Sequence, residues 1–378
     1  MEDMPSDLNG AHHAVLPRSG PLVVLLSGTN KNDGEFDFWG YAQRASASCI
    51  LLNNGQNRWY QDGVPGFGGS VSGTAELIRE WASALRAPEI VCIGASMGGS
   101  AAVLYGTHVD ARVLAFSFEA HLRHPGSRSA KYIPTDFPLP YPDLSPLIRQ
   151  SKMPITSLFG GDDVIDVAES SRLMGTPNLV LTCLQGVDHA LPRHLRTTGQ
   201  LTPYLNNFVA GRTLPRLRNE DDDLATPEYA KCIATAYRSV LEKRGMDALV
   251  AARRAVQLRP FALVPRLLAG RALLLLKQPE ASLQHLGVAA SLDRTHESRL
   301  FLGRALRGLR RNIQAADFHA ETLAIHPSAH SVLYDRALAL WSATERDAAR
   351  ADLAKAIALA PKAAAYKSRL STWDAIKA

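Results

Sequence analysis

The chain has 378 residues, of which 46% are hydrophobic, and carries a formal net charge of +6. A chain of this length accommodates two domains, each with enough apolar residues to bury a core. It contains no run of eighteen apolar residues, which excludes a predicted membrane span. Residues 1–20 are polar, are interrupted by Pro, Gly and His, and lack the apolar centre of a signal peptide, so we expect a flexible N-terminus and a cytoplasmic protein.

The four cysteines indicate buried thiols rather than a disulfide framework. Cys49, Cys92 and Cys183 lie in apolar, strand-like runs, and no cysteine spacing is typical of a zinc site. The sequence therefore predicts neither a metal nor a cofactor.

Short apolar runs alternate with segments of helical period along the first part of the chain. The predicted strands are 21–26, 47–52, 90–93, 111–116, 155–159 and 179–183, and the predicted helices are 36–44, 74–85, 100–106 and 167–174. Such alternation predicts an α/β fold over residues 21–218, with a mostly parallel, doubly wound sheet covered by helices on both faces. Residues 121–153 are rich in Pro, Arg and Tyr without a clear period, and we interpret them as an inserted loop or small lid.

A second domain is predicted after an acidic linker at residues 219–227. The linker begins Asn-Glu-Asp-Asp-Asp, and the chain from 228 to 378 is rich in Ala, Leu and Arg. Leu258, Leu292, Ile325 and Leu359 occupy equivalent places at spacings of 34, 33 and 34 residues. Small residues recur within each unit where two helices must approach closely, as at Gly270 and Ala289, Gly303 and Ala315, or Ala337 and Ala356. This pattern resembles a degenerate tetratricopeptide repeat, which implies an all-α array of helix pairs.

The two halves differ in charge. Residues 1–225 hold 18 Lys and Arg against 23 Asp and Glu, whereas residues 226–378 hold 24 against 13. The arginines of the second half are scattered at helical spacing rather than clustered with aromatics. We therefore expect either a solvated face or an acidic protein partner for the repeats, and no nucleic acid.

The stretch 94–98, Gly-Ala-Ser-Met-Gly, is the strongest functional motif. It follows the apolar run 90–93 and opens a helical pattern of small residues. A G-x-S-x-G motif between a strand and a helix places the serine on a sharp turn with its hydroxyl exposed, and this arrangement suits a nucleophile. We predict that Ser96 is that nucleophile.

A serine nucleophile needs a base, and the base needs an orienting acid. The predicted strand 155–159 leads into Gly160-Gly161-Asp162-Asp163, and the predicted strand 179–183 leads to Asp188-His189. Serine, acid and histidine thus follow one another at the ends of successive strands.

With these motifs, residues 20–210 resemble a serine α/β-hydrolase. The resemblance implies that His189 is the base and Asp163, by its Gly160-x-x-Asp163 spacing, the acid, with Asp162 as the alternative acid. It also implies an oxyanion hole formed by the backbone N–H of Met97 and a second donor near Gly28 and Thr29. That second loop departs from the family's common His-Gly pattern.

Aromatic residues follow the second predicted strand. Trp59 and Tyr60 stand at the same sheet edge as the serine, so they are candidates for the substrate pocket; a surface loop closed by glycines is the alternative interpretation.

The resemblance implies a serine-dependent esterase that cleaves an ester or thioester, carried by a small molecule or a glycan, through an acyl-enzyme. The helical repeats would dock a partner or substrate. Two alternatives stay open: an acyltransferase acting on a glycan hydroxyl in surface-polysaccharide synthesis, and a repeat-based adaptor with a non-catalytic hydrolase fold.

Overall fold

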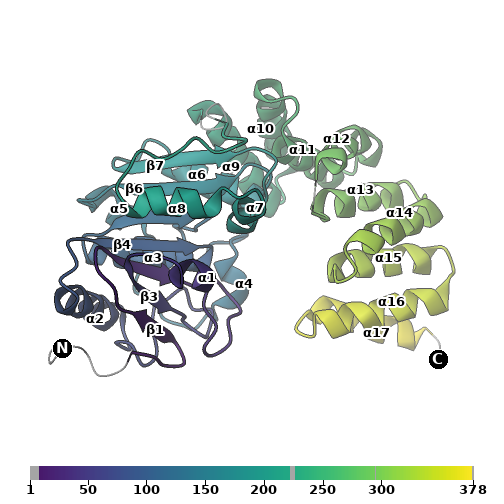
Figure 1. Ribbon diagram of the computed structural model, residues 1–378. Helices are drawn as coiled ribbons and strands as arrows, with labels where there is room; N and C mark the ends of the chain where they lie inside the picture. Colours follow the sequence, from purple (N-terminus) through teal and green to yellow (C-terminus); the bar gives the residue numbers. More distant parts are fainter. Residues whose placement is uncertain (1–7, 222–225, 294, 377–378) are drawn as a thin grey trace. The chain divides into compact units, whose positions relative to one another are not determined.

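The computed structural model describes residues 8–221, 226–293 and 295–376, and the chain divides into two compact units (Figure 1). Unit 1 is Met1–Ala234 and unit 2 is Thr235–Ala378. Over the described residues, no helix is both long enough and apolar enough to cross a membrane.

Unit 1 is built on one sheet, which within the described residues has seven strands in the order β1-β3-β2-β4-β5-β6-β7. The strands are β1 (His13–Leu16), β2 (Leu22–Leu26), β3 (Ser48–Leu52), β4 (Ile90–Ala95), β5 (Arg112–Phe116), β6 (Ile155–Gly160) and β7 (Leu179–Leu184). All neighbouring strands pair in parallel except β1, which pairs antiparallel with β3. The predicted fold class, a mostly parallel α/β sheet followed by helical repeats, is confirmed.

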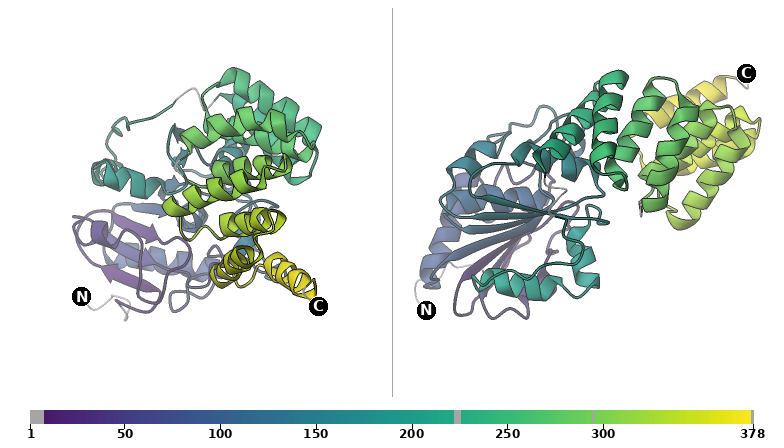
Figure 2. Two further views of the ribbon diagram at one scale, coloured as in Figure 1. Left: turned by 90° about the vertical axis from the view of Figure 1, so that its right-hand side faces the viewer. Right: turned by 90° about the horizontal axis from the view of Figure 1, so that it is seen from above.

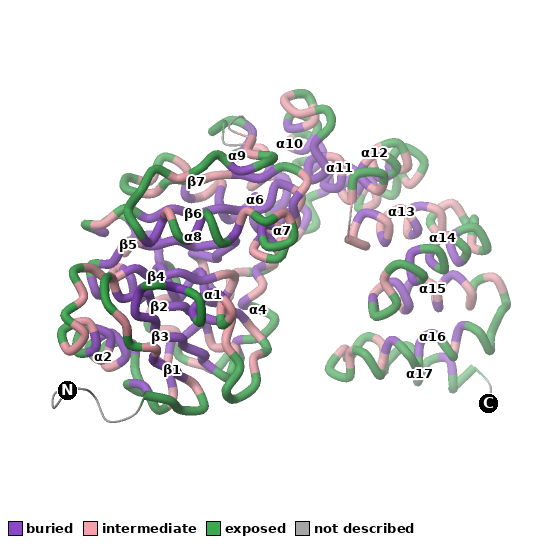
Figure 3. Tube along the Cα trace, viewed as in Figure 1, coloured by how far each residue is buried: buried purple, intermediate pink, exposed green. Residues whose placement is uncertain are grey.

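Helices cover both faces of this sheet (Figure 2). On one face, α2 (Val71–Ala84), α3 (Met97–His108) and α5 (Ser145–Gln150) pack against side chains such as Val24 and Cys92. On the other, α1 (Trp39–Ala42), α7 (Leu191–Thr197) and α8 (Leu201–Val209) pack against the alternate side chains, such as Val23 and Val91. Because both faces are covered, the central strands are buried throughout (Figure 3), and this explains why they appear in the sequence as continuous apolar runs.

The sequence predicts that residues 1–20 are flexible, but part of this segment forms a strand. His13–Leu16 form β1, whose register pairs His13 with Leu52 and Leu16 with Cys49. The apolar run of this strand, Ala14 to Leu16, is too short to be recognised as a strand in a polar segment, yet β1 pairs with the otherwise open edge of β3. Residues 1–7 lie outside the described residues.

The predicted linker begins as part of unit 1. Asn219 accepts a hydrogen bond from the N–H of Gln185 at 2.9 Å, and the N–H of Asp221 donates to the carbonyl of Cys183 at 3.0 Å. The start of the predicted linker, at Asn219 and Asp221, is therefore hydrogen-bonded to β7 and to Gln185, the residue that follows β7. Residues 222–225 of the predicted linker lie outside the described residues.

Unit 2 consists of helix pairs in series, entered from α9 (Pro227–Leu241), which crosses the boundary between the units. The following helices are α10 (Gly245–Leu258), α11 (Leu263–Leu275), α12 (Pro279–Leu292), α13 (Glu297–Gly308), α14 (Asn312–Ile325), α15 (His330–Ser342), α16 (Arg346–Leu359) and α17 (Ala364–Ala375). The four equivalent residues of the sequence repeat are the last residues of α10, α12, α14 and α16. The repeat therefore marks the end of the second helix of each pair.

Small residues stand where helices of a pair meet, as the sequence predicts. A Cβ added to Gly270 would lie 2.4 Å from a side-chain atom of Leu286, and one added to Gly303 would lie 2.2 Å from the ring of His319. The alanines 289, 315, 337 and 356 are fully buried. Larger side chains at these places would force the paired helices apart.

Candidate active site

Ser96 lies on a strained turn between β4 and α3. Its backbone has φ 56° and ψ −120°, a combination that residues other than glycine rarely adopt. The turn is tight because its two glycines lie against backbone. A Cβ at Gly94 would lie 2.0 Å from the carbonyl oxygen of Gly98, and a Cβ at Gly98 would lie 2.1 Å from that of Leu26.

These contacts predict that Gly98→Ala destabilises unit 1 by about 3 kcal/mol or more, because the neighbouring atom is backbone and cannot rotate away. Thermal unfolding of the full chain checks this. Gly40→Ala is the control, since a Cβ there meets only the side chain of Arg44 at 3.7 Å or more. Equal melting temperatures for the two variants would contradict this view of the turn.

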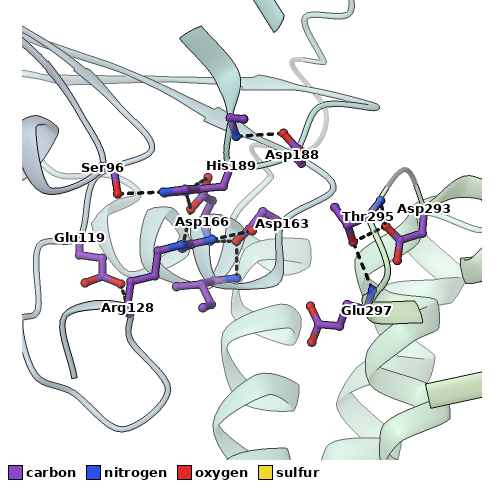
Figure 4. A network of polar contacts seen from close by, with 12 residues as sticks. Ser96, Glu119, Arg128, Asp163, Asp166, Asp188, His189, Asp293, Thr295 and Glu297 are labelled. Carbon is purple, nitrogen blue, oxygen red and sulfur yellow. Dashed lines mark hydrogen bonds and ion pairs between the residues drawn. The ribbon is translucent and has the colours of Figure 1, made fainter. Parts of the chain in front are cut away.

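The hydroxyl of Ser96 is joined to a histidine and a carboxylate by a chain of hydrogen bonds (Figure 4). His189 follows β7, and its Nε2 lies 2.9 Å from Ser96 Oγ. Its Nδ1 lies 2.9 and 3.1 Å from the two carboxylate oxygens of Asp166. In the neutral imidazole, Nδ1–H donates to Asp166 and Nε2 accepts the proton of Ser96.

The sequence predicted that Asp163 lies beside His189, but the carboxylate in contact with the imidazole is that of Asp166. Asp163 caps the N-terminus of α6 (Val164–Leu173): its Oδ1 accepts from the N–H groups of Ile165 and Asp166 at 2.9 Å. Its Oδ2 accepts from Arg128 Nη2 at 2.5 Å. Both oxygens are thus committed, and an N-cap position directs the carboxylate at the helix backbone.

The other two aspartates of this region also have structural partners. Asp162 Oδ1 accepts from the N–H of Gly186 at 3.2 Å, and Asp188 Oδ1 accepts from the N–H of Ala190 at 2.9 Å. Each bond stabilises the loop that carries His189. The alternative acid Asp162 is therefore not placed at the imidazole either.

Arg128, which no sequence motif singled out, binds both Asp163, the N-cap of α6, and Asp166 in the first turn of that helix. Its Nη1 lies 3.0 Å from Asp166 Oδ1, and its other terminal nitrogen binds Asp163 (Figure 4). Arg128 directly precedes α4 (Ser129–Tyr132), within the segment interpreted as a loop or lid. Glu119 in turn accepts hydrogen bonds from the backbone N–H groups of Arg128 and Ser129, which fixes this segment in place.

Asp163, Asp166 and His189 lie close enough together to hold a metal ion, since one ligand atom of each lies within 4.8 Å of the others. The cation that these two carboxylates contact is the guanidinium of Arg128, and Nε2 of His189 faces the serine. The donor set therefore suits an acid–base chain better than a metal site.

Burial and charge act in opposite directions on His189. Burial, the largest single influence, lowers its pKa, but the charge of Asp166, its hydrogen bond to the imidazole and the charge of Asp163 act together in the other direction, so the pKa of His189 lies above its ordinary value of 6.5. For Asp163, burial is the largest single influence and raises the pKa, but Arg128, His189 and the backbone N–H of Asp166 together lower it to about 2. Asp163 therefore stays ionised at neutral pH.

We expect kcat/KM to fall on the acid side with an apparent pKa above 6.5, because only the neutral imidazole accepts the serine proton. In Asp166→Asn this limb moves to lower pH, since the charge that raises the pKa is gone. A pH–rate profile of both proteins on one ester tests the shift. An acid limb in the same place in the two proteins would show that another group controls it.

One of the two predicted backbone donors near Gly28 is already occupied. The N–H of Gly28 donates to Asp37 Oδ2 at 2.8 Å. Within the described part of the chain, the N–H of Thr29 has no acceptor, and Met97, as the first residue of α3, has no intrahelical one. Of the three predicted residues, Met97 and Thr29 therefore keep an N–H free for an oxyanion.

Trp59 and Tyr60 do not line the cavity beside the serine. Both are at most 1% exposed, and the hydroxyl of Tyr60 donates to the carbonyls of Ser27 and Leu52 at 2.9 and 3.0 Å. They are core residues. The cavity at Ser96 has a volume of about 670 Å³ and lies instead beside residues 28–44, α7 and the start of α8.

Comparison with known proteins gives partial likenesses. No family model matches the chain, and no curated protein matches it significantly. A thermophilic esterase from Thermogutta terrifontis is 16% identical with a TM-score of 0.37, over 53% of this chain and 93% of that one. An α/β-hydrolase from a lagoon-sediment metagenome is 15% identical with a TM-score of 0.35, over 53% and 95%.

A thermophilic tetratricopeptide-repeat protein from Thermus thermophilus is 20% identical with a TM-score of 0.36, over 48% of this chain and 95% of that one. At these identities and TM-scores the matches assign no activity to the chain.

Proposed function

We propose that unit 1 is a serine hydrolase that cleaves an ester or thioester through an acyl-enzyme. The observation that carries the proposal is the unbroken chain Ser96–His189–Asp166, with hydrogen bonds of 2.9 Å on each side of the imidazole. A scaffold has no need of a serine at φ 56° aimed at a histidine that a buried carboxylate orients.

In the proposed reaction, Ser96 Oγ attacks the acyl carbon while His189 Nε2 takes its proton. Asp166 holds the imidazole in the required tautomer and stabilises the imidazolium that forms. The tetrahedral intermediate collapses, His189 returns the proton to the departing alcohol or thiol, and the acyl group remains on Ser96. Water then attacks the acyl carbon while His189 Nε2 takes its proton; the second tetrahedral intermediate collapses, His189 returns that proton to Ser96 Oγ, and the acid departs.

The negative charge of the tetrahedral intermediate would be stabilised by the N–H groups of Met97 and Thr29. Met97 also stands at the N-terminal end of α3, where the helix dipole favours negative charge. Gly28 is not included among these donors, because its N–H donates to Asp37.

Turnover of a panel of 4-nitrophenyl esters and acyl thioesters by the full chain tests the proposal. We expect at least one member to be cleaved about 10⁶-fold or more faster than in buffer alone. A folded protein that cleaves none of them would favour the adaptor alternative, in which the hydrolase fold binds without catalysis.

Adding glycerol or a sugar to the same assay separates hydrolysis from acyl transfer. A hydrolase releases free acid, whereas an acyltransferase shows a new ester whose yield rises with the acceptor concentration. Our proposal predicts that free acid predominates. A dominant glycan ester would support the alternative of acyl transfer to a sugar hydroxyl.

For unit 2 we propose an acidic peptide as partner. A cavity of about 780 Å³ there is lined by Lys243, Arg271, Lys277 and Arg304 together with apolar side chains such as Phe301. Titration of the full chain with a fluorescent Glu-rich peptide tests this, with a Lys-rich peptide as control. We expect binding that weakens with salt and in Lys243→Glu/Lys277→Glu; equal binding of both peptides would contradict it.

A further inference from the structure

The cavity beside Ser96 is unusually cationic. It is lined by five charged side chains besides the histidine: Lys31, Asp37, Arg44, Arg193 and Arg196. Lys31 and Asp37 form an ion pair at 2.7 Å. The three arginines form no ion pair with any described residue, which leaves three uncompensated positive charges around the cavity.

Arginines elsewhere in unit 1 are of both kinds: Arg79 and Arg86, like the three at the cavity, form no ion pair with a described residue, whereas others do. Arg58, Arg112, Arg128 and Arg172 each lie within ion-pair distance of a carboxylate. Moreover, residues 1–225 contain more acidic than basic side chains, 23 against 18. Carboxylates are therefore abundant in this half of the chain, yet none is placed against Arg44, Arg193 or Arg196.

The location of two of these arginines also favours a ligand. Arg193 and Arg196 are three residues apart on α7, which begins two residues after His189. Side chains at this spacing lie on the same face of a helix, and like charges there destabilise the helix. An anion held between them would remove this repulsion.

Apolar side chains complete the cavity wall. Phe36, Phe38, Trp39 and Leu201 line it, and the rings of Phe36 and Trp39 stack with centroids 6.2 Å apart. The cavity thus offers an apolar surface next to the serine and cationic groups on α7 and on the C-terminal side of α1. A substrate that fits both has an apolar segment between its reacting carbonyl and a negatively charged group.

We propose that the cavity binds the anionic group of an amphipathic ester or thioester substrate, and that Arg44, Arg193 and Arg196 recognise its carboxylate or phosphate. The proposal rests on the proposed hydrolase function only in that it takes the bound anion to be part of a substrate. The binding of the anion itself does not depend on turnover. The arginines are specificity-determining residues, and the charge of the ligand draws it to the cavity before the reaction.

The first test is calorimetric and needs no turnover. The full chain is titrated with phenyl phosphate and with benzoate, and with benzyl alcohol as the neutral control. We expect at least one anion to bind more tightly than the alcohol, and the stronger of the two identifies phosphate or carboxylate. In Arg193→Gln/Arg196→Gln the preference should fall about tenfold, at roughly threefold for each exposed arginine. Arg149→Gln, an exposed arginine on α5 outside the cavity, should leave it unchanged.

The second test compares mono-4-nitrophenyl adipate with 4-nitrophenyl hexanoate, which differ by a terminal carboxylate in place of a methyl group. We expect the ratio of their kcat/KM values to favour adipate at low salt, to decline as salt rises, and to fall about tenfold in the double variant. If neither anion outcompetes benzyl alcohol, or if the preference survives the double substitution, the inference is overturned. A preference for anions without cleavage of these two esters or of any member of the panel would instead overturn the hydrolase proposal alone.

Discussion

Replacing Ser96 with Ala is expected to abolish ester turnover while the protein stays folded. The substitution removes the nucleophilic oxygen that lies 2.9 Å from His189 Nε2. Loss of a serine nucleophile typically lowers kcat by about 10⁶-fold, down to the level that binding and the oxyanion donors supply alone. Steady-state turnover of the best ester from the panel measures the loss.

Ser83→Ala is the matched control, since Ser83 is an exposed serine on α2. It should retain full turnover, and the melting temperatures of both variants should stay within a few degrees of that of the unchanged protein. Turnover by Ser96→Ala at more than a few per cent of the original rate would show that another group carries the reaction.

Replacing Asp166 with Asn is expected to lower kcat by about 10³–10⁴-fold with little effect on KM. An amide presents an N–H to the imidazole and favours the tautomer with its proton on the wrong nitrogen. The geometry stays nearly intact, because Asn is isosteric with Asp. The measurement is kcat and KM on the same ester.

Asp163→Asn distinguishes the role of Asp163, the N-cap of α6, from that of Asp166 in its first turn. Its side-chain oxygen still caps the helix, but the charge that binds Arg128 is gone, so we expect lower stability and a much smaller loss of kcat. The lowered pKa of Asp163 means that its ion pair stabilises the fold above its ordinary pKa of 3.8 and is lost as the pH falls towards 2. A larger loss of kcat in Asp163→Asn than in Asp166→Asn would return the role to Asp163.

The nucleophile turn could be predicted from the sequence because its determinants are local. Gly94 and Gly98 lie within two residues of Ser96, and the contacts that require them are with the turn itself and the adjacent strand β2. The sheet could also be predicted from the sequence, since buried parallel strands are continuous apolar runs. The repeat spacing revealed the helix pairs because the close approach at Gly270 and Gly303 recurs in each unit.

The carboxylate that binds His189 could not be predicted, because its identity depends on where α6 begins. The sequence pattern predicts a helix from residue 167, which leaves both Asp163 and Asp166 in a loop. The helix begins at Val164, so Asp163 becomes its N-cap and Asp166 lies in its first turn, aimed at His189. The one local signal is that an aspartate just before a helix is a favoured N-cap, and its carboxylate is then used by the backbone.

Contacts between segments far apart in the chain also could not be predicted from the sequence. Arg128 reaches α6 across 35 residues, and Tyr60 binds Ser27 across 33, and neither pairing leaves a periodic trace in the chain. For the same reason the prediction that Trp59 and Tyr60 line a pocket was wrong. Aromatic residues at a sheet edge fit a pocket or the core equally well until the packing around them is known.

Labelling with a fluorophosphonate, followed by peptide mass mapping, tests the central claim most directly. The reagent forms a stable adduct only with an activated nucleophile, so it reports the Ser96–His189–Asp166 chain without knowledge of the substrate. The proposal predicts one adduct per chain, on the peptide that contains Ser96, slowed strongly in Asp166→Asn and absent in Ser96→Ala. No adduct on the folded protein, or an adduct on another residue that persists in Ser96→Ala, would contradict it.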